Sequence, residues 1–304
     1  MKKIFSIFAA ALILFGAVSC KNKKDEPSAP KTTFTIEISN ITDEGCDFII
    51  TPSDNTVEYM RMFMTTEQLE NNTPVEIVKS QFSALEVVYT DLKNHGHIHQ
   101  GRYGDTYTDL TDDTEYVLAV FRIDENLNIV GDVALSKSFY TLPYGFVDLG
   151  LPSGTLWQVF NINNSDHPGY LWTWDEAMAK YPFSIPTKEQ WQELLNNCDW
   201  EWFDYYKHFY VSSRQEGNSN YIWVEAYGNG SCGTTNVYNK DKYTFYWSST
   251  EAGTDDATAY IGSKDEYNNI EDEFAKCTPL ALKLVAENPN RVPSLKPIKP
   301  IKIE

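Results

Sequence analysis

Residues 185–202 read IPTKEQWQELLNNCDWEW, and this stretch decides the fold of the second half of the chain. Thr187 is placed to cap a helix, and Gln190, three residues later, closes a capping box. Apolar side chains then recur at the spacing of one helical face: Trp191, Leu194, Leu195 and Cys198. The stretch therefore predicts an amphipathic helix, followed at once by an aromatic segment around Trp200 and Trp202.

The segments on either side are short, aromatic and rich in Gly and Asn. All eight tryptophans lie between Trp157 and Trp247. Thr173 and Glu176 predict a second capped helix. These short segments are FVDLGLPSGTLW (146–157), GYLWTWDEA (169–177), GNSNYIW (217–223) and YWSST (246–250). This pattern is typical of a loop-rich α+β domain in which large rings fill the core.

In order and wording these segments resemble the Fibrobacter-type major paralogous domain, which is abundant in surface lipoproteins of the Bacteroidetes. The resemblance covers roughly residues 146–286. It implies a C-type-lectin-like fold, distantly akin to formylglycine-generating enzymes, and we expect this domain over residues 144–290. The chain departs from calcium-dependent lectins, because Trp247-Ser248-Ser249 stands where they have Trp-Asn-Asp. It also lacks a recognisable reactive cysteine pair, so calcium-dependent sugar binding and the enzyme activity are not supported.

The first half, residues 32–143, is expected to be an all-β sandwich. Phe34, Ile36 and Ile38 alternate with polar residues, as on a half-buried strand. Further strands are expected over 46–50, 59–64, 117–121, 129–130 and at 139. The Leu110…Thr114-x-Tyr116 pattern resembles the tyrosine corner of fibronectin type III domains, which implies a hydrogen bond from the phenol back to the chain.

A helical insertion interrupts this sandwich. Thr73, Pro74 and Glu76 form a helix start. Apolar residues then recur at helical spacing, and Gly96 is placed to end the helix: Val78, Phe82, Leu85, Tyr89 and Leu92. We expect the helix to cover one edge or face of a sheet.

The N-terminus predicts export. Residues 1–19 have two lysines, an apolar run and small residues, as in a signal peptide. The ending at Cys20 resembles a lipobox, so we expect Cys20 to be acylated and to become the mature N-terminus. Residues 20–31 are expected to be a flexible tether and residues 291–304 an extended tail. Lys24-Asp25-Glu26 looks like a surface-export signal, which favours the outer membrane, facing the cell exterior.

Composition excludes some partners. Of 304 residues, 42% are hydrophobic and 14% aromatic, which is ample for two folded domains. The formal charge of −18 argues against nucleic acid or an anionic membrane surface as partner. Contact with the membrane is expected only through the N-terminal lipid.

Candidate ligand-binding rings lie in the stretch 221–246, where aromatics alternate with Gly and Asn. We predict an aromatic binding surface at Trp223, Tyr227, Tyr238 and Tyr243. His95, His97 and His99 alternate, but same-face neighbours on a strand are about 6.6 Å apart, which is too far for one tetrahedral ion. The acidic residues between 255 and 273 could bind calcium, but a run of this kind is more often a solvated face, which is the interpretation adopted. No catalytic residue, metal site or cofactor is predicted.

Four cysteines remain beside Cys20, and three pairings are open on paper. Lectin-like folds bring the first helix and the last strand together. The resemblance therefore suggests a Cys198–Cys277 disulfide.

The function predicted from the sequence is a lipid-anchored, non-enzymatic surface protein whose C-terminal domain binds a glycan or a surface or host protein. Two alternatives remain open. One is an enzyme or enzyme accessory of the formylglycine-generating type, and the other is a purely structural or adhesive surface component.

Overall fold

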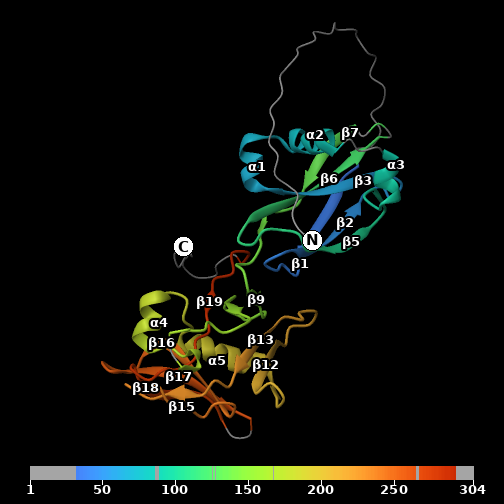
Figure 1. Cartoon of the computed structure of the whole chain (residues 1–304). Coiled ribbons are helices and arrows are strands. Elements are labelled where there is room, and N and C mark those ends of the chain that lie inside the picture. Colours follow the sequence, from blue (N-terminus) through green and yellow to red (C-terminus); the bar gives the residue numbers. More distant parts are fainter. Residues whose placement is uncertain are drawn as a thin grey trace, which may run out of the picture. The chain divides into compact units, whose positions relative to one another are not determined.

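The computed structural model describes residues 32–291, except 86–88, 125, 127, 167 and 265–266. The expected signal peptide, Cys20, nearly all of the tether and the tail from residue 292 lie outside the described residues. Strands dominate the described part of the chain (Figure 1). Every strand pairing joins two residues within 34–140 or two residues within 146–286. The two halves are therefore described one at a time.

The first half contains two antiparallel sheets. One has the order β1-β2-β5, and the other the order β4-β3-β6-β7, with β8 paired to β6. The strands are β1 Phe34–Ser39, β2 Cys46–Pro52, β3 Glu58–Thr65, β4 His99–Gln100, β5 Tyr103–Tyr107, β6 Glu115–Ile123, β7 Ile129–Leu135 and β8 Phe139–Tyr140.

Strand β6 is buried on both faces, because a core lies on each side of it. Leu118 and Val120 pack with Phe48 and Ile50 of β2, between the two sheets. The intervening residues Val117, Ala119 and Phe121 point the other way, against a helical layer. The first half is thus a β-sandwich with helices covering one outer face.

The helical layer consists of α1 Thr66–Asn71, α2 Pro74–Leu85 and α3 Tyr89–Asn94 (Figure 1). As predicted, Thr73 caps α2. Its hydroxyl accepts a hydrogen bond from the Glu76 amide at 3.3 Å, and the Glu76 carboxylate accepts one from the Thr73 amide at 2.8 Å. The single helix expected from residue 73 to 96 is observed as α2 and α3, with residues 86–88 between them not described. Gly96 follows α3 with a φ of 74°, the left-handed conformation of a helix end. Ile77, Val78 and Leu92 pack on the sheet, so the predicted covering of a sheet face is confirmed.

The corner before β6 has the expected hydrogen bond. The hydroxyl of Tyr116 accepts from the backbone amide of Thr111 at 3.1 Å, five residues upstream. The Tyr116 ring is buried beside Cys46, Leu110 and Phe139. This contact joins the start of β6 to the loop that leads into it.

The second half combines two helices with several short sheets. The elements are β9 Phe146–Asp148, β10 Leu156–Gln158, a 3-10 turn Pro168–Tyr170, α4 Trp174–Lys180, α5 Lys188–Asn197, β11 Cys198–Phe203, β12 His208–Ser213, β13 Tyr221–Glu225, β14 Asn229–Gly230, β15 Val237–Tyr238, β16 Tyr243–Glu251, β17 Asp256–Ser263, β18 Tyr267–Ala275 and β19 Val285–Ala286. The sheet orders are β19-β10-β9, β11-β12-β13, β14-β15 and β16-β17-β18.

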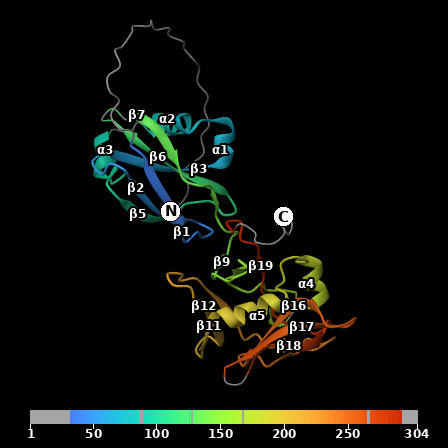
Figure 2. The ribbon, with the colours of Figure 1, turned by 180° about the vertical axis from the view of Figure 1, so that it is seen from behind.

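Helix α5 organises the main core of this half. Thr187 and Gln190 form the predicted capping box, and Thr173 and Glu176 form the predicted box of α4. Trp191 and Leu194 point from α5 into a cluster that includes Val211 and Val224 of the β11-β12-β13 sheet and Tyr260 of β17. The helix therefore packs between two sheets, and it can be followed from behind in Figure 2. Among the described residues, no helix has the length and apolarity needed to span a membrane.

Candidate functional site

The β11-β12-β13 sheet carries rings on both faces. Phe209, Val211, Ile222 and Val224 point inward, and Trp200 and Trp202 of β11 pack against the same core. Because side chains alternate along a strand, the residues between them occupy the opposite, outer face. Five outer rings of the strands, together with Tyr206 of the β11–β12 turn, which stacks on His208, form what we call the aromatic face: Phe203, Tyr206, His208, Tyr210, Tyr221 and Trp223.

The rings of the aromatic face touch one another in a continuous set. Trp223 lies at the centre, with ring centroids 4.2 Å from His208, 5.1 Å from Tyr210, 5.2 Å from Tyr221 and 6.2 Å from Phe203. Cross-strand pairing explains this arrangement, since Tyr210 is directly opposite Trp223 in the register of β12 and β13.

The aromatic face is partly open to solvent. Tyr206 is 65% exposed, and Phe203 and Tyr221 are 36% and 37% exposed. Tyr210 and Trp223 are intermediate. No aliphatic side chain belongs to this face: the other outward residues of the three strands are Asp199, Glu201, Ser212 and Glu225. The surface is therefore apolar in its rings and polar at their tips and between them.

His208 is the buried member of the face. It is 9% exposed, stacked on Tyr206 at 5.4 Å with an interplanar angle of 4°, and its Nε2 atom has no hydrogen-bond partner among the described residues. Burial lowers the pKa of the imidazole below its ordinary value of 6.5. The ring is thus neutral near pH 7 and acts as part of the aromatic packing.

Buried polar contacts hold the free edge of β13, next to Trp223. The Trp223 amide donates to the Val159 carbonyl at 3.1 Å. Lys283, fully buried, donates from Nζ to the Trp223 carbonyl at 2.5 Å and to the Val159 carbonyl at 3.0 Å. Two residues further along, the Glu225 amide donates to the Tyr246 hydroxyl at 2.8 Å. These contacts fix the backbone that carries Trp223.

Lys283 and Glu225 form a buried charged pair. Burial lowers the pKa of Lys283 to about 7, and the Glu225 carboxylate opposes that shift. Burial likewise raises the pKa of Glu225, with Lys283 opposing it. Each group therefore offsets part of the cost of burying the other's charged form, and removing one leaves the second without that compensation.

The four rings predicted from the sequence do not gather into one set. Trp223 belongs to the aromatic face. Tyr227 packs against the core that contains Trp191, and Tyr243 packs against the neighbouring core that contains Trp247. Tyr238 is 48% exposed, and its hydroxyl accepts from Asn236 at 3.1 Å. Among the described residues, no ring contact joins any two of the four.

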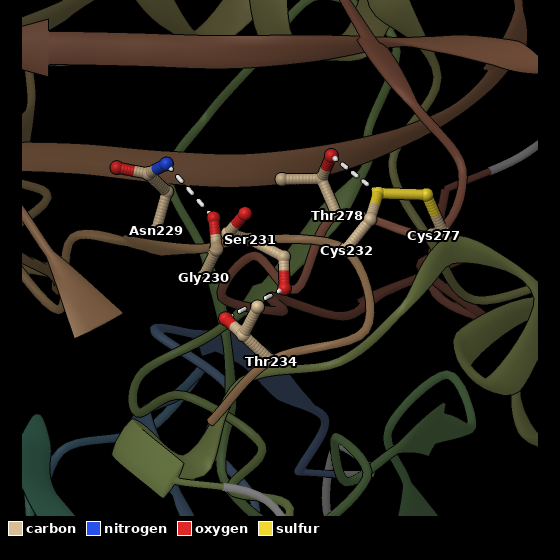
Figure 3. Close-up of a disulfide and its surroundings, with 7 residues drawn as sticks. All are labelled: Asn229, Gly230, Ser231, Cys232, Thr234, Cys277 and Thr278. Carbon is tan, nitrogen blue, oxygen red and sulfur yellow. Dashed lines mark hydrogen bonds between the residues drawn. A yellow bond between two sulfur atoms is a disulfide. The ribbon is translucent and has the colours of Figure 1, made fainter. Parts of the chain in front are cut away.

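The predicted Cys198–Cys277 disulfide is wrong. Cys277 pairs with Cys232 instead, with their Cα atoms 5.1 Å apart (Figure 3). Cys198 ends α5 and starts β11, and its side chain is fully buried in the core beside Trp191. Cys232 reaches Cys277 because the Gly230 amide donates to the Pro279 carbonyl at 2.7 Å, which holds the segment after β14 against the one after β18. The hydroxyl of Thr278 lies 3.6 Å from the Cys232 sulfur (Figure 3).

The remaining thiols show no sign of reactivity. Cys46 and Cys198 lie in different core clusters. Burial raises the pKa of each thiol to about 12, whereas a nucleophilic cysteine needs a lowered pKa.

Candidate metal ligands are dispersed. His99 stacks on Tyr103 with centroids 3.7 Å apart, whereas His95 and His97 are exposed. Within the described part of the chain, no three His, Cys, Asp or Glu side chains gather closely enough to hold an ion. Of the late acidic residues, Asp256 lies in β17 and residues 271–273 lie in β18. Asp265 and Glu266 are outside the described residues.

No protein-family model, no curated protein and no solved structure matches this chain significantly. The case for function therefore depends on the chain's own residues.

Proposed function

We propose that this protein is a lipid-anchored cell-surface binding protein that binds a glycan through the aromatic face of the β11-β12-β13 sheet. The observation that carries the proposal is that six rings contact one another in a continuous set that is partly open to solvent. Soluble proteins normally bury rings of this size, and a continuous exposed set marks an interaction surface.

The make-up of the aromatic face favours a sugar as ligand. The flat C–H side of a pyranose ring stacks on an aromatic ring, while its hydroxyls need hydrogen-bonding groups at the rim. Tyr206, Tyr210 and Tyr221 supply phenol hydroxyls, and Glu201 and Asp199 supply carboxylates, beside the central Trp223.

The anchor and the domain types are part of the same proposal. Cys20 would carry the lipid, residues 20–31 would form the tether, and the protein would face outward from the outer membrane. The first half would be a fibronectin type III-like spacer, supported by the Tyr116–Thr111 hydrogen bond. The second half would be a major paralogous, C-type-lectin-like domain, supported by the two capped helices and the aromatic core around Trp191.

The experiment is a glycan array and a surface-protein array probed with residues 21–304. The double variant Tyr206→Ser/Tyr221→Ser should lose most glycan binding and keep its melting temperature, because both rings are exposed. Phe183→Ser is the matched control, since Phe183 is 77% exposed and lies outside the three strands. Binding only to proteins, or glycan binding that survives the double variant, would contradict the proposal.

A further inference from the structure

One carboxylate stands among the outward rings without a cation. Glu201 lies on β11 directly opposite Tyr210 on β12, and its neighbours Trp200 and Trp202 point into the core. Its side chain is exposed. Its charge is one reason, after burial and Tyr221, that the pKa of Tyr210 is raised. No ion pair of Glu201 is found among the described residues.

The other acidic residues nearby differ in this respect. Asp199 pairs with Arg214 at 2.7 Å, and Asp204 pairs with Lys207 at 3.1 Å and Lys264 at 2.9 Å. Lys207 and Arg214 are the two basic residues between 198 and 225, and that stretch also holds five acidic residues: Asp199, Glu201, Asp204, Glu216 and Glu225. Among the described residues, Glu201 is therefore the outward acidic residue of these strands that no basic side chain opposes, on a chain whose formal charge is −18.

We infer that the aromatic face takes a glycan with free amino groups, such as a glucosamine polymer, and that Glu201 binds its ammonium group. This inference rests on the proposed function and names the ligand class. Stacking on Trp223 and Tyr210 supplies contact area, and the charge-assisted bond to Glu201 selects the amine. A carboxylate or sulfate group of a polymer placed at the same position would be repelled by Glu201.

The test compares two soluble hexamers with the same β-1,4-linked backbone. One is fully de-acetylated glucosamine, and the other is its fully N-acetylated counterpart, which carries no charge. Affinities are measured by calorimetry on residues 21–304 at mildly acidic pH and at two salt concentrations. The de-acetylated hexamer should bind more tightly, and its advantage should shrink as salt rises.

The decisive variant is Glu201→Gln, with Glu216→Gln as matched control in the β12–β13 turn. Glu201→Gln should weaken binding of the de-acetylated hexamer roughly three- to tenfold, the effect of losing one charge-assisted hydrogen bond. Affinity for the acetylated hexamer should not change, and Glu216→Gln should change neither. Equal binding of both hexamers, or no effect of Glu201→Gln, would overturn the inference and leave the glycan proposal standing. Failure of every glycan to bind the unmodified protein would overturn both.

Discussion

The buried ammonium group of Lys283 donates a hydrogen bond to the backbone carbonyl of Trp223, at 2.5 Å. A charged group from the end of the domain thereby holds the central ring of the aromatic face from behind. The only other charge that acts on its pKa is that of Glu225 on the same strand. The position of Trp223 therefore depends on a fully buried lysine whose charge is opposed by that of Glu225.

Replacing one member of this pair should be costly. Lys283→Met fills a similar volume but leaves Glu225 unpaired, so the free energy of unfolding should fall by about 3–5 kcal/mol in urea titrations. The double variant Lys283→Met/Glu225→Gln should recover a large part of this loss, because no buried charge is left alone. If the double variant loses as much unfolding free energy as the two single variants together, Lys283 and Glu225 do not interact.

The Cys232–Cys277 disulfide should stabilise the second half. It closes a loop of 45 residues, for which chain entropy gives about 4 kcal/mol. The variant Cys232→Ser/Cys277→Ser should therefore have its unfolding midpoint at a lower urea concentration. A reducing agent should lower the midpoint of the unmodified protein by the same amount. A further shift of the variant on reduction would mean that another disulfide exists.

The N-terminal cap of α5 should stabilise the folded protein measurably by itself. Thr187→Ala removes the hydroxyl that accepts from the Gln190 amide at 3.2 Å, and should cost about 1 kcal/mol in unfolding free energy. Thr187→Ser keeps the hydroxyl acceptor, so its unfolding free energy should stay close to that of the unmodified protein. Equal losses for Ala and Ser would assign the effect to the methyl group of Thr187 instead of the cap.

Acid should weaken the first half through His99. Burial, assisted by the nearby charges of Arg61 and His97, lowers the pKa of His99 to about 4 from an ordinary value of 6.5. Between these two values the unfolded chain binds a proton that the folded chain does not, so the free energy of unfolding falls as pH drops from 6.5 toward 4.

The matched variant for this effect is His99→Phe, which keeps a ring to stack on Tyr103 and removes the titrating group. Its unfolding free energy should fall less than that of the unmodified protein over the same pH range. Parallel pH curves for the two proteins would contradict the assignment to His99.

Local features of the fold were predictable because their signals lie within a few residues. The capping boxes that begin at Thr73, Thr173 and Thr187 each depend only on two residues three positions apart, and all three boxes are observed. The alternation in residues 34–38 likewise predicted β1. The hydrogen bond of Tyr116 spans five residues and was also predicted correctly.

Features that depend on strand register were not predictable in the same way. The alternation of Phe209 and Val211 with His208 and Tyr210 indicates that Tyr210 and His208 share a face of β12. That Tyr210 lies opposite Trp223 follows only from the pairing of β12 with β13. Trp200 and Trp202 both lie on the inner face of β11. Only the pairing of β11 with β12 brings the outward ring of Phe203 beside Tyr210. The partner of Cys277 depended on how the segments after β14 and β18 meet, which no local pattern encodes.

The most direct test of the account follows the indole N–H signals of the eight tryptophans by NMR during titration with the two hexamers. The Trp223 signal is assigned with a Trp223→Phe variant. A hexamer bound to the aromatic face should shift the Trp223 signal and leave those of the fully buried Trp157, Trp191 and Trp247 unchanged. Binding that leaves the Trp223 signal in place would contradict the assignment of the binding site to this face.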